Sequence, residues 1–184
     1  MMGPGIDSFE IRLLTSDPDT LSQLCDLITE VVAAGGSVSF MHPLAAAQAR
    51  AFWAGAMAAA ARGERLILGA WVAGCLISTV TLLLDCPPNQ PHRAEIAKMM
   101  TRPEWRGRGA ASALLREAEA QASARQRTLI VLDTASDGGA AGLYEKHGYQ
   151  LAGEIPGYAL KPHGGLTGTL MYWKRLKLED KGSR

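Results

Sequence analysis

The residues best suited to chemistry lie in the turn 106–111, which reads Arg-Gly-Arg-Gly-Ala-Ala and precedes a predicted helix. Glycines let a ligand approach the backbone, and the free N–H groups and dipole at a helix start favour an anion. Arg106 and Arg108 add two positive charges. The turn therefore predicts a phosphate-binding site, although an ordinary glycine-rich helix start with solvated arginines explains the same residues about equally well.

Two other phosphate-binding motifs fit this turn less well. In the dinucleotide motif G-x-G-x-x-G, Ser112 takes the place of the third glycine, and residues 103–106 before the turn do not form a strand pattern. A P-loop requires the string G-K-S/T, which the sequence lacks. A nicotinamide-dependent oxidoreductase is therefore a minor alternative.

A carboxylate and a histidine are the candidates for acid–base work. Asp133 ends the apolar run 128–133, and the end of a central strand faces the crevice where α/β sheets bind ligands. We interpret Asp133 as a base or an amine-binding group, with a turn or capping role as the alternative. His42 precedes Pro43 in a loop and could bind an acceptor, although a single loop histidine is more often structural.

The N-terminal half predicts a strand, two helices and two further strands. Phe9, Ile11 and Leu13 alternate with polar residues, as in a half-buried strand. Asp17 is placed to cap a helix from Pro18 to Ala34, which a Gly35-Gly36 pair would end. A loop over 35–43 and an alanine-rich second helix follow. The β-branched segment 66–84 predicts two strands, with Gly69 and Gly74 breaking the run.

The C-terminal half alternates between strands and helices. A strand from Arg93 to Thr101 leads through the basic turn into a helix, a strand at 128–133, a short helix at 138–148 and a strand at 149–155. A Gly/Pro-rich connection, 156–168, precedes a last strand over 168–176. The alternation predicts an α/β domain. Without a repeat or dividing linker, residues 1–184 form one predicted domain, with 1–7 and 179–184 as flexible tails.

Composition excludes several classes of partner. A chain of 184 residues with 47% hydrophobic content can bury the core of one domain. The net charge of +1, without a long basic run, predicts no nucleic-acid or membrane partner. Three cysteines without C-x-x-C spacing predict no metal site. No leader or membrane-spanning stretch is evident, so we expect a cytoplasmic monomer or homodimer.

The order of these motifs resembles the GNAT superfamily of N-acetyltransferases from Phe9 to about Leu178. Arg106, Gly109 and Ala111 match the family's coenzyme A motif Q/R-x-x-G-x-G/A. Residues 143–149 match its downstream signature L-Y-E-K-x-G-F/Y. The resemblance implies a mixed, mostly antiparallel central sheet flanked by helices, whose strands at 93–101 and 128–133 splay apart.

The resemblance further implies acetyl-coenzyme A as the cofactor, with pantetheine between the splayed strands. The residues that would contact it are Met99, Met100 and Thr101 on the first strand, Arg106, Gly107, Arg108, Gly109, Ala110 and Ala111 in the turn, and Asp137 and Ala140 before the short helix. GNAT enzymes often have asparagine where this chain has Asp137, which could instead cap the helix. Met99 and Met100 could also be plain core residues.

The chemistry of acyl transfer from a thioester requires deprotonation of an amine and protonation of a thiolate. In GNAT enzymes the tyrosine that matches Tyr144 resembles a general acid beside the thioester sulfur, which a phenol can protonate. A core tyrosine is the alternative for Tyr144. With Asp133 as the base, the two catalytic candidates stand eleven residues apart.

A closer resemblance is to the tabtoxin-resistance type of GNAT protein. It rests on residues 37–44 (SVSFMHPL), 132–134 (LDT) and 155–160 (IPGYAL). In that type an aspartate and a tyrosine are implicated in catalysis, and they match Asp133 and Tyr144. The same resemblance implies that segments 37–43 and 157–162 wall the acceptor site. The acceptor contacts would be Ser37, Phe40, His42, Asp133 and Tyr158.

We therefore expect an acetyl-coenzyme A-dependent N-acetyltransferase that acts by direct attack of the primary amine of a small, amino-acid-like or antibiotic-like acceptor. Acetylation of a protein or peptide amine is one alternative, and an open, peptide-sized groove would favour it. A noncatalytic acyl-coenzyme A sensor is another, and the presence of both Asp133 and Tyr144 argues against it. The identity of the acceptor does not follow from these motifs, because loops form acceptor walls in such folds.

Overall fold

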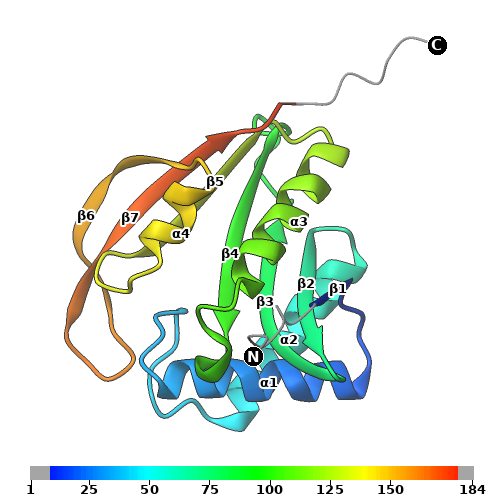
Figure 1. Ribbon diagram of the computed structural model, residues 1–184, viewed down its shortest axis with the longest axis vertical. Coiled ribbons are helices and arrows are strands. Elements are labelled where there is room, and N and C mark those ends of the chain that lie inside the picture. The colour runs from blue at the N-terminus through cyan, green and yellow to red at the C-terminus, as the bar shows by residue number, and fades with distance from the viewer. Residues whose placement is uncertain (1–8, 178–184) are drawn as a thin grey trace, which may run out of the picture.

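Seven strands form one mixed sheet in the computed structural model, which describes residues 9–177 (Figure 1). The strands are β1 (Glu10–Leu13), β2 (Arg65–Val72), β3 (Cys75–Leu83), β4 (Arg93–Thr101), β5 (Leu129–Ala135), β6 (Gln150–Leu160) and β7 (Leu166–Arg175), in the spatial order β1-β2-β3-β4-β5-β7-β6. Only β4 and β5 pair in parallel, and the other neighbours are antiparallel. The predicted fold class is confirmed.

Within residues 9–177, four α-helices flank the sheet. They are α1 (Pro18–Ala33), α2 (Ala46–Ala61), α3 (Ala110–Ala124) and α4 (Ala141–Lys146), with a short 3₁₀ helix, η1 (Pro103–Trp105), before α3. The Asp17 carboxylate accepts a hydrogen bond of 2.9 Å from the Thr20 amide and so caps α1 as predicted. Gly35, with φ of 85°, follows the end of the helix in the left-handed conformation.

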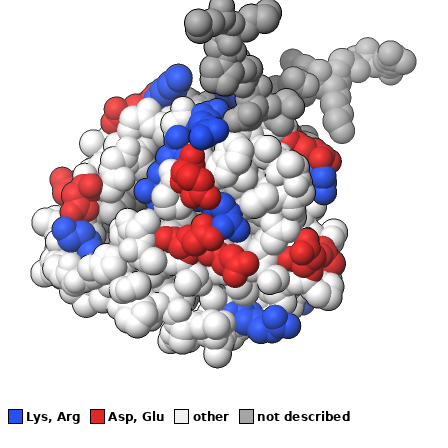
Figure 2. Space-filling model, turned by 60° about the horizontal axis from the view of Figure 1, so that its bottom comes forward, with Lys and Arg blue, Asp and Glu red and all other residues white. Residues whose placement is uncertain are grey.

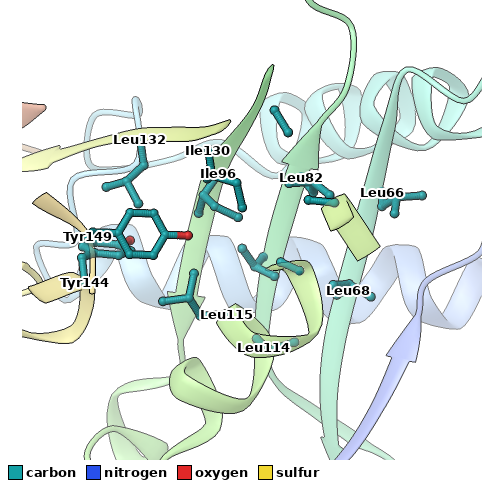
Figure 3. Packing of buried hydrophobic residues seen from close by; sticks show 14 of the residues in the cluster. Leu66, Leu68, Leu82, Ile96, Leu114, Leu115, Ile130, Leu132, Tyr144 and Tyr149 are labelled. Atoms are coloured by element: carbon teal, nitrogen blue, oxygen red, sulfur yellow. The ribbon is translucent and has the colours of Figure 1, made fainter. Parts of the chain in front are cut away.

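The two faces of the sheet bury separate cores. Helices α3 and α4 pack on one face, where Leu114, Leu115 and Tyr144 meet sheet residues such as Leu82 and Ile96 (Figure 3). Helices α1 and α2 cover the opposite face around Ile67 and Trp53, which is fully buried. Since side chains alternate along a strand, adjacent residues of β2, Leu66 and Ile67, belong to different cores.

Gly69 does not break the strand pair, contrary to the sequence prediction. It lies inside β2 opposite Thr79, and the chain turns at Ala73 and Gly74 instead. A Cβ atom built on Gly69 would lie 2.6 Å from Leu76 Cδ1 and 2.8 Å from Leu14 Cδ2. The glycine therefore serves close packing, which sequence patterns cannot distinguish from a break.

The predicted connection over 156–168 is also wrong, because most of it is strand. β6 continues to Leu160 and β7 begins at Leu166. The β6–β7 register shifts between Ile155 and Ala159, which pair with Thr169 and Thr167. Pro156 and Gly157, with φ of 62°, therefore lie in a bulge of an edge strand, where proline is tolerated.

The surface carries mixed charge. On the face drawn in Figure 2, basic and acidic side chains lie close together, and neither sign covers a large area. Among the helices of residues 9–177, none is long and apolar enough to cross a membrane. The tails predicted at 1–7 and 179–184 lie outside the described residues.

Candidate functional site

The parallel strands β4 and β5 separate after three residue pairs. Arg93, Ala94 and Glu95 pair with Leu129, Ile130 and Val131, and pairing between these strands ends there. The remainder of both strands borders a cleft of about 720 Å³. Because β3 and β7 still hold the outer edges of β4 and β5, the cleft is part of the rigid sheet.

Met99, Met100 and Thr101 bring the end of β4 into this cleft. Met100 and Thr101 pair with Thr79 and Ser78 of β3, so the β5-facing edge of β4 borders the cleft. The Met100 side chain is only 2% exposed and belongs to the core on the α1 and α2 face. Met100 is therefore a core residue, and its carbonyl oxygen accepts a hydrogen bond of 2.7 Å from the Ser78 hydroxyl of β3.

The turn before α3 lies at one end of the cleft. Gly107 and Gly109 have φ of 76° and 92°, a conformation that favours glycine. A Cβ atom at either position would meet nothing within 4 Å. Gly109 is the N-cap of α3 and makes no side-chain cap bond, so the first amides of the helix, including those of Ala110 and Ala111, lack a cap from it.

The two arginines of the turn, Arg106 and Arg108, have different contacts. Arg106 lines the cleft with Ala111, and its Nε donates to the Thr101 carbonyl at 3.4 Å. The Arg108 guanidinium lies 4.7 Å from the centre of the Trp105 ring. Open backbone, a helix dipole and the Arg106 charge suit a pyrophosphate group.

Asp133 and Tyr144 line the same cleft from β5 and α4. Asp133 is exposed, and its Oδ2 accepts a hydrogen bond of 3.1 Å from the Thr169 hydroxyl of β7. Tyr144 is 4% exposed, with its ring centre 5.8 Å from that of Tyr149 and 6.1 Å from that of Tyr172. Figure 3 shows Tyr144 beside Tyr149, near Leu132.

Burial and charge act together on the Tyr144 phenol. Burial raises the pKa of Tyr144 to about 12, and the nearby Asp133 carboxylate contributes in the same direction. The hydroxyl therefore stays protonated at any physiological pH. Asp133 and Tyr144 also lie close enough to interact electrostatically.

Asp137 does not cap α4 and instead holds the β6–β7 hairpin. Its carboxylate accepts hydrogen bonds from the Thr167 hydroxyl at 2.7 Å and from Lys161 Nζ at 3.0 Å. These two bonds lower the pKa of Asp137, with the Thr167 bond the larger cause. The N-cap of α4 is Ala140, which lines the cleft together with Asp137.

The predicted acceptor residues separate into two groups. Ser37 and Tyr158 line the cleft from the α1–α2 loop and β6. Phe40 instead packs on Phe52 of α2, with ring centres 5.2 Å apart, and His42 lies against His163 at 4.6 Å. Phe40 and His42 are not among the residues that line the cleft.

Sequence reasoning missed Lys98, Thr169 and Lys161, all of which line the cleft. Lys98 is one of three charged residues in β4, with Arg93 and Glu95, so its charge alone gave no signal that it enters the cleft. Thr169 orients Asp133 from a strand far along the chain, which no local pattern reveals. Within residues 9–177, no cluster of three or more His, Cys, Asp or Glu side chains could hold a metal ion.

Comparison with known proteins identifies the class. Residues 34–149 match the profile of the Acetyltransferase (GNAT) family, and the chain belongs to that family. It is therefore an N-acetyltransferase with acetyl-coenzyme A as its cofactor. This assignment removes the dinucleotide alternative.

Solved structures share the fold at low sequence identity. A phosphinothricin acetyltransferase from Sinorhizobium meliloti, solved with acetyl-coenzyme A, superposes with a TM-score of 0.79 at 18% identity, covering 95% of this chain and 92% of its own. A ribosomal-protein-alanine N-acetyltransferase from Brucella melitensis gives 0.75 at 19%, covering 91% and 99%. A putative acetyltransferase from Acinetobacter baylyi gives 0.78 at 18%, covering 96% and 97%. These likenesses concern the fold alone.

Proposed function

We propose that this enzyme transfers the acetyl group of acetyl-coenzyme A to the primary amine of a small acceptor by direct attack, with Asp133 and Tyr144 as the catalytic residues. One observation carries the proposal. Asp133 and Tyr144 line the same cleft as the free edge of β4 and the start of α3. The proposed donor-binding and acid–base residues therefore border one cleft.

The donor fits the cleft at two places. The free edge of β4 at Met99, Met100 and Thr101 offers backbone groups for pantetheine, as a neighbouring strand would. The turn 106–111 offers open backbone and positive charge for the pyrophosphate. Asp137 and Ala140 border the cleft on the β5 side. When bound, acetyl-coenzyme A supplies a thioester carbonyl as the electrophile and a thiolate as the leaving group.

Asp133 is proposed to remove a proton from the acceptor ammonium, directly or through water. Amines with a pKa of ~8 to ~10 are mostly protonated at neutral pH, so the reactive form must be generated in the site. The Thr169 hydroxyl holds Oδ2 of Asp133, which leaves Oδ1 for the acceptor. The amine nitrogen then forms a bond to the carbonyl carbon, and the carbon–sulfur bond breaks.

Tyr144 is proposed to face the leaving sulfur with its hydroxyl group. Its pKa of about 12 lies above the ~8.5 of a thiol, so complete proton transfer to the thiolate is uphill. We therefore expect Tyr144 Oη to stabilise the sulfur by a hydrogen bond, and the departing thiolate to take up the second proton, which the nitrogen loses after its attack. The products are an N-acetyl amide, coenzyme A and one proton.

A small acceptor is favoured by the way the cleft is walled. Ser37, from the α1–α2 loop, and Tyr158, from β6, both line the cleft. The Asp137 bonds to Thr167 and Lys161 fasten the β6–β7 hairpin to the segment after β5. Such a fastened wall suits a small molecule better than an open peptide groove. The S-V-S-F-M-H-P-L and I-P-G-Y-A-L segments support a tabtoxin-resistance type of acceptor and a role in resistance.

We also propose that residues 1–184 form a single acetyltransferase domain, because one sheet spans the described chain from β1 to β7. The function is tested by thiol release from acetyl-coenzyme A with amino acids, β-lactam amino acids, aminoglycosides, polyamines and an alanine-initiated peptide. We expect release with an amino-acid-like amine. Release with the peptide alone would replace the small-molecule proposal with protein acetylation, and binding of the cofactor without any release would favour a sensor.

A further inference from the structure

Lys98 adopts a conformation that is unusual for its place in the sheet. It lies in the middle of β4 with φ of 49°, in the left-handed region that disfavours side chains. In the β3–β4 register, Thr79 pairs with Met100 and Thr81 with Ala97, so β4 has one extra residue there. Such a bulge redirects a side chain, and Lys98 lines the cleft.

The partner of Lys98 is strained in the same way. Lys98 Nζ donates a hydrogen bond of 2.9 Å to the hydroxyl of Ser39, whose φ is 75°. The other two non-glycine residues with positive φ in the described chain, Ala73 and Gln126, lie in turns between elements. Two of the four strained residues thus meet at the cleft, and strain of this kind concentrates at functional sites.

The Lys98 ammonium stands in the cleft without a carboxylate in contact. Within residues 9–177 it takes part in no ion pair; Nζ donates to the Ser39 hydroxyl and lies 5.7 Å from the centre of the Phe52 ring. Burial lowers the pKa of Lys98, whereas Asp133 and Glu95 act to raise it. A partly desolvated cation facing a ligand cleft favours an anionic ligand group.

We infer that Lys98 determines acceptor specificity by binding a carboxylate of the acceptor while Asp133 takes its amine. This inference rests on the proposed acetyl transfer in the same cleft. Asp133 and Lys98 are of opposite charge, both line the cleft and they interact electrostatically without forming an ion pair. A zwitterionic amino acid complements this arrangement, whereas a diamine or an amino ester offers Lys98 no carboxylate.

Lys161, the other lysine of the cleft wall, is less suited to this role. Its Nζ already contacts the Asp137 carboxylate at 3.0 Å, so its charge is compensated. Arg106 belongs to the turn before α3, which is proposed to bind the pyrophosphate of the donor and not the acceptor. Lys98 is therefore the cation best placed for the acceptor.

The test compares each accepted amino acid with its methyl ester and its decarboxylated amine, measured as kcat/KM for thiol release. We expect at least a ~10-fold preference for the acid, since a hydrogen bond between charged groups contributes this much. Lys98→Met should reduce the preference to below ~3-fold, mainly through KM for the acceptor. Lys98→Arg should retain most of it. Lys146 is an exposed lysine that does not line the cleft, so Lys146→Met serves as the control. It also removes one positive charge and should leave the preference for the acid unchanged.

Calorimetric binding of acetyl-coenzyme A shows that each variant retains a folded donor site. Should Lys98→Met fail to fold, Lys98→Gln is used in its place, since it keeps a polar side chain beside Ser39. The role of Lys98 would be overturned by equal kcat/KM for acid and ester in the wild-type enzyme. A preference for the acid that survives Lys98→Met, or Lys98→Gln where that variant is used, would overturn it as well. Neither result would affect the proposed acetyl transfer. Cofactor binding without thiol release from any amine would overturn the proposed function, and this inference with it.

Discussion

Replacement of Tyr144 by phenylalanine removes one hydroxyl group from the proposed site and little else. The ring is 4% exposed and keeps its contacts with Tyr149 and Tyr172. With a pKa raised to about 12 by burial, Tyr144 keeps its proton at neutral pH and is a weaker acid than a thiol, whose pKa is ~8.5 in water. The phenol should therefore act through a hydrogen bond to the developing thiolate.

The size of the effect follows from that hydrogen bond. A bond to a charged group contributes ~1.5 to ~3 kcal/mol, which corresponds to a ~10- to ~150-fold loss of kcat. The dissociation constant of acetyl-coenzyme A should change less than ~2-fold, because the lost interaction forms chiefly in the transition state. Thiol release at saturating acceptor gives kcat, and calorimetry gives the affinity.

Tyr149→Phe provides a matched control. Its ring adjoins that of Tyr144, but Tyr149 does not line the cleft, and its hydroxyl lies near Glu119. Removal of this hydroxyl should leave kcat within ~2-fold of the wild-type value. The reasoning is refuted by a loss below ~3-fold in Tyr144→Phe, or by equal losses in both variants.

Three further predictions concern the base, the donor site and stability. Asp133→Asn should lower kcat/KM by ~10²-fold or more, with a smaller loss at high pH, where the acceptor amine is already neutral. A raised KM for the acceptor with an unchanged pH profile would show that Asp133 binds the acceptor and is not the base. Gly109→Ala, at φ of 92°, should weaken acetyl-coenzyme A binding by ~10-fold or more. Gly74→Ala, at φ of 79° in the β2–β3 turn, carries similar strain and should leave the affinity unchanged. Equal affinities of the two variants in calorimetry would contradict cofactor binding by the turn 106–111. Burial raises the pKa of Tyr144 above its unfolded value of 10.0, so the protonated phenol contributes up to ~3 kcal/mol to the free energy of unfolding below pH ~10, and this contribution is lost as the pH rises to ~12. In urea unfolding, Tyr144→Phe should therefore lose less stability than the wild type between pH ~10 and ~12. Identical losses would contradict the assignment.

Core packing gives a separate test that does not depend on function. Gly69→Ala should destabilise the fold by ~1 to ~3 kcal/mol, because its Cβ would lie within 3 Å of Leu76 and Leu14 side chains. Gly55→Ala, in the middle of α2 with nothing within 4 Å, should stabilise it by ~0.5 to ~1 kcal/mol. Urea unfolding measures both, and a shift of the same sign in the two variants would contradict the packing argument.

The features predicted well from the sequence are those set by local chemistry. The Asp17 cap, the glycine end of α1 and the bounds of β4 follow from residues close together in the chain. The turn at Gly107 and Gly109 was recognisable because its positive φ angles favour glycine. Membership of the GNAT family followed from motifs in the same region.

The features that were missed depend on register and on distant strands. The bulge that turns Lys98 into the cleft arises from β3–β4 pairing, and a lysine with positive φ gives no sequence signal of it. The sequence predicted a loop at Pro156 and Gly157, where the structure has a β-bulge. Proline and glycine are common in both kinds of structure, so the residue types do not distinguish them. The packing of Phe40 on Phe52 likewise joins two segments and was not expected from the sequence, and its contact with an acceptor stays a prediction.

Our central proposal is that the cleft between β4 and β5 binds acetyl-coenzyme A. Calorimetric titration of the purified protein with acetyl-coenzyme A tests it most directly, with Gly109→Ala measured in parallel. The account predicts binding at a single site in the micromolar range, weakened by the Gly109 substitution. Absence of binding, or binding with equal affinity in the variant, would contradict it and leave the turn at 106–111 as an ordinary helix start.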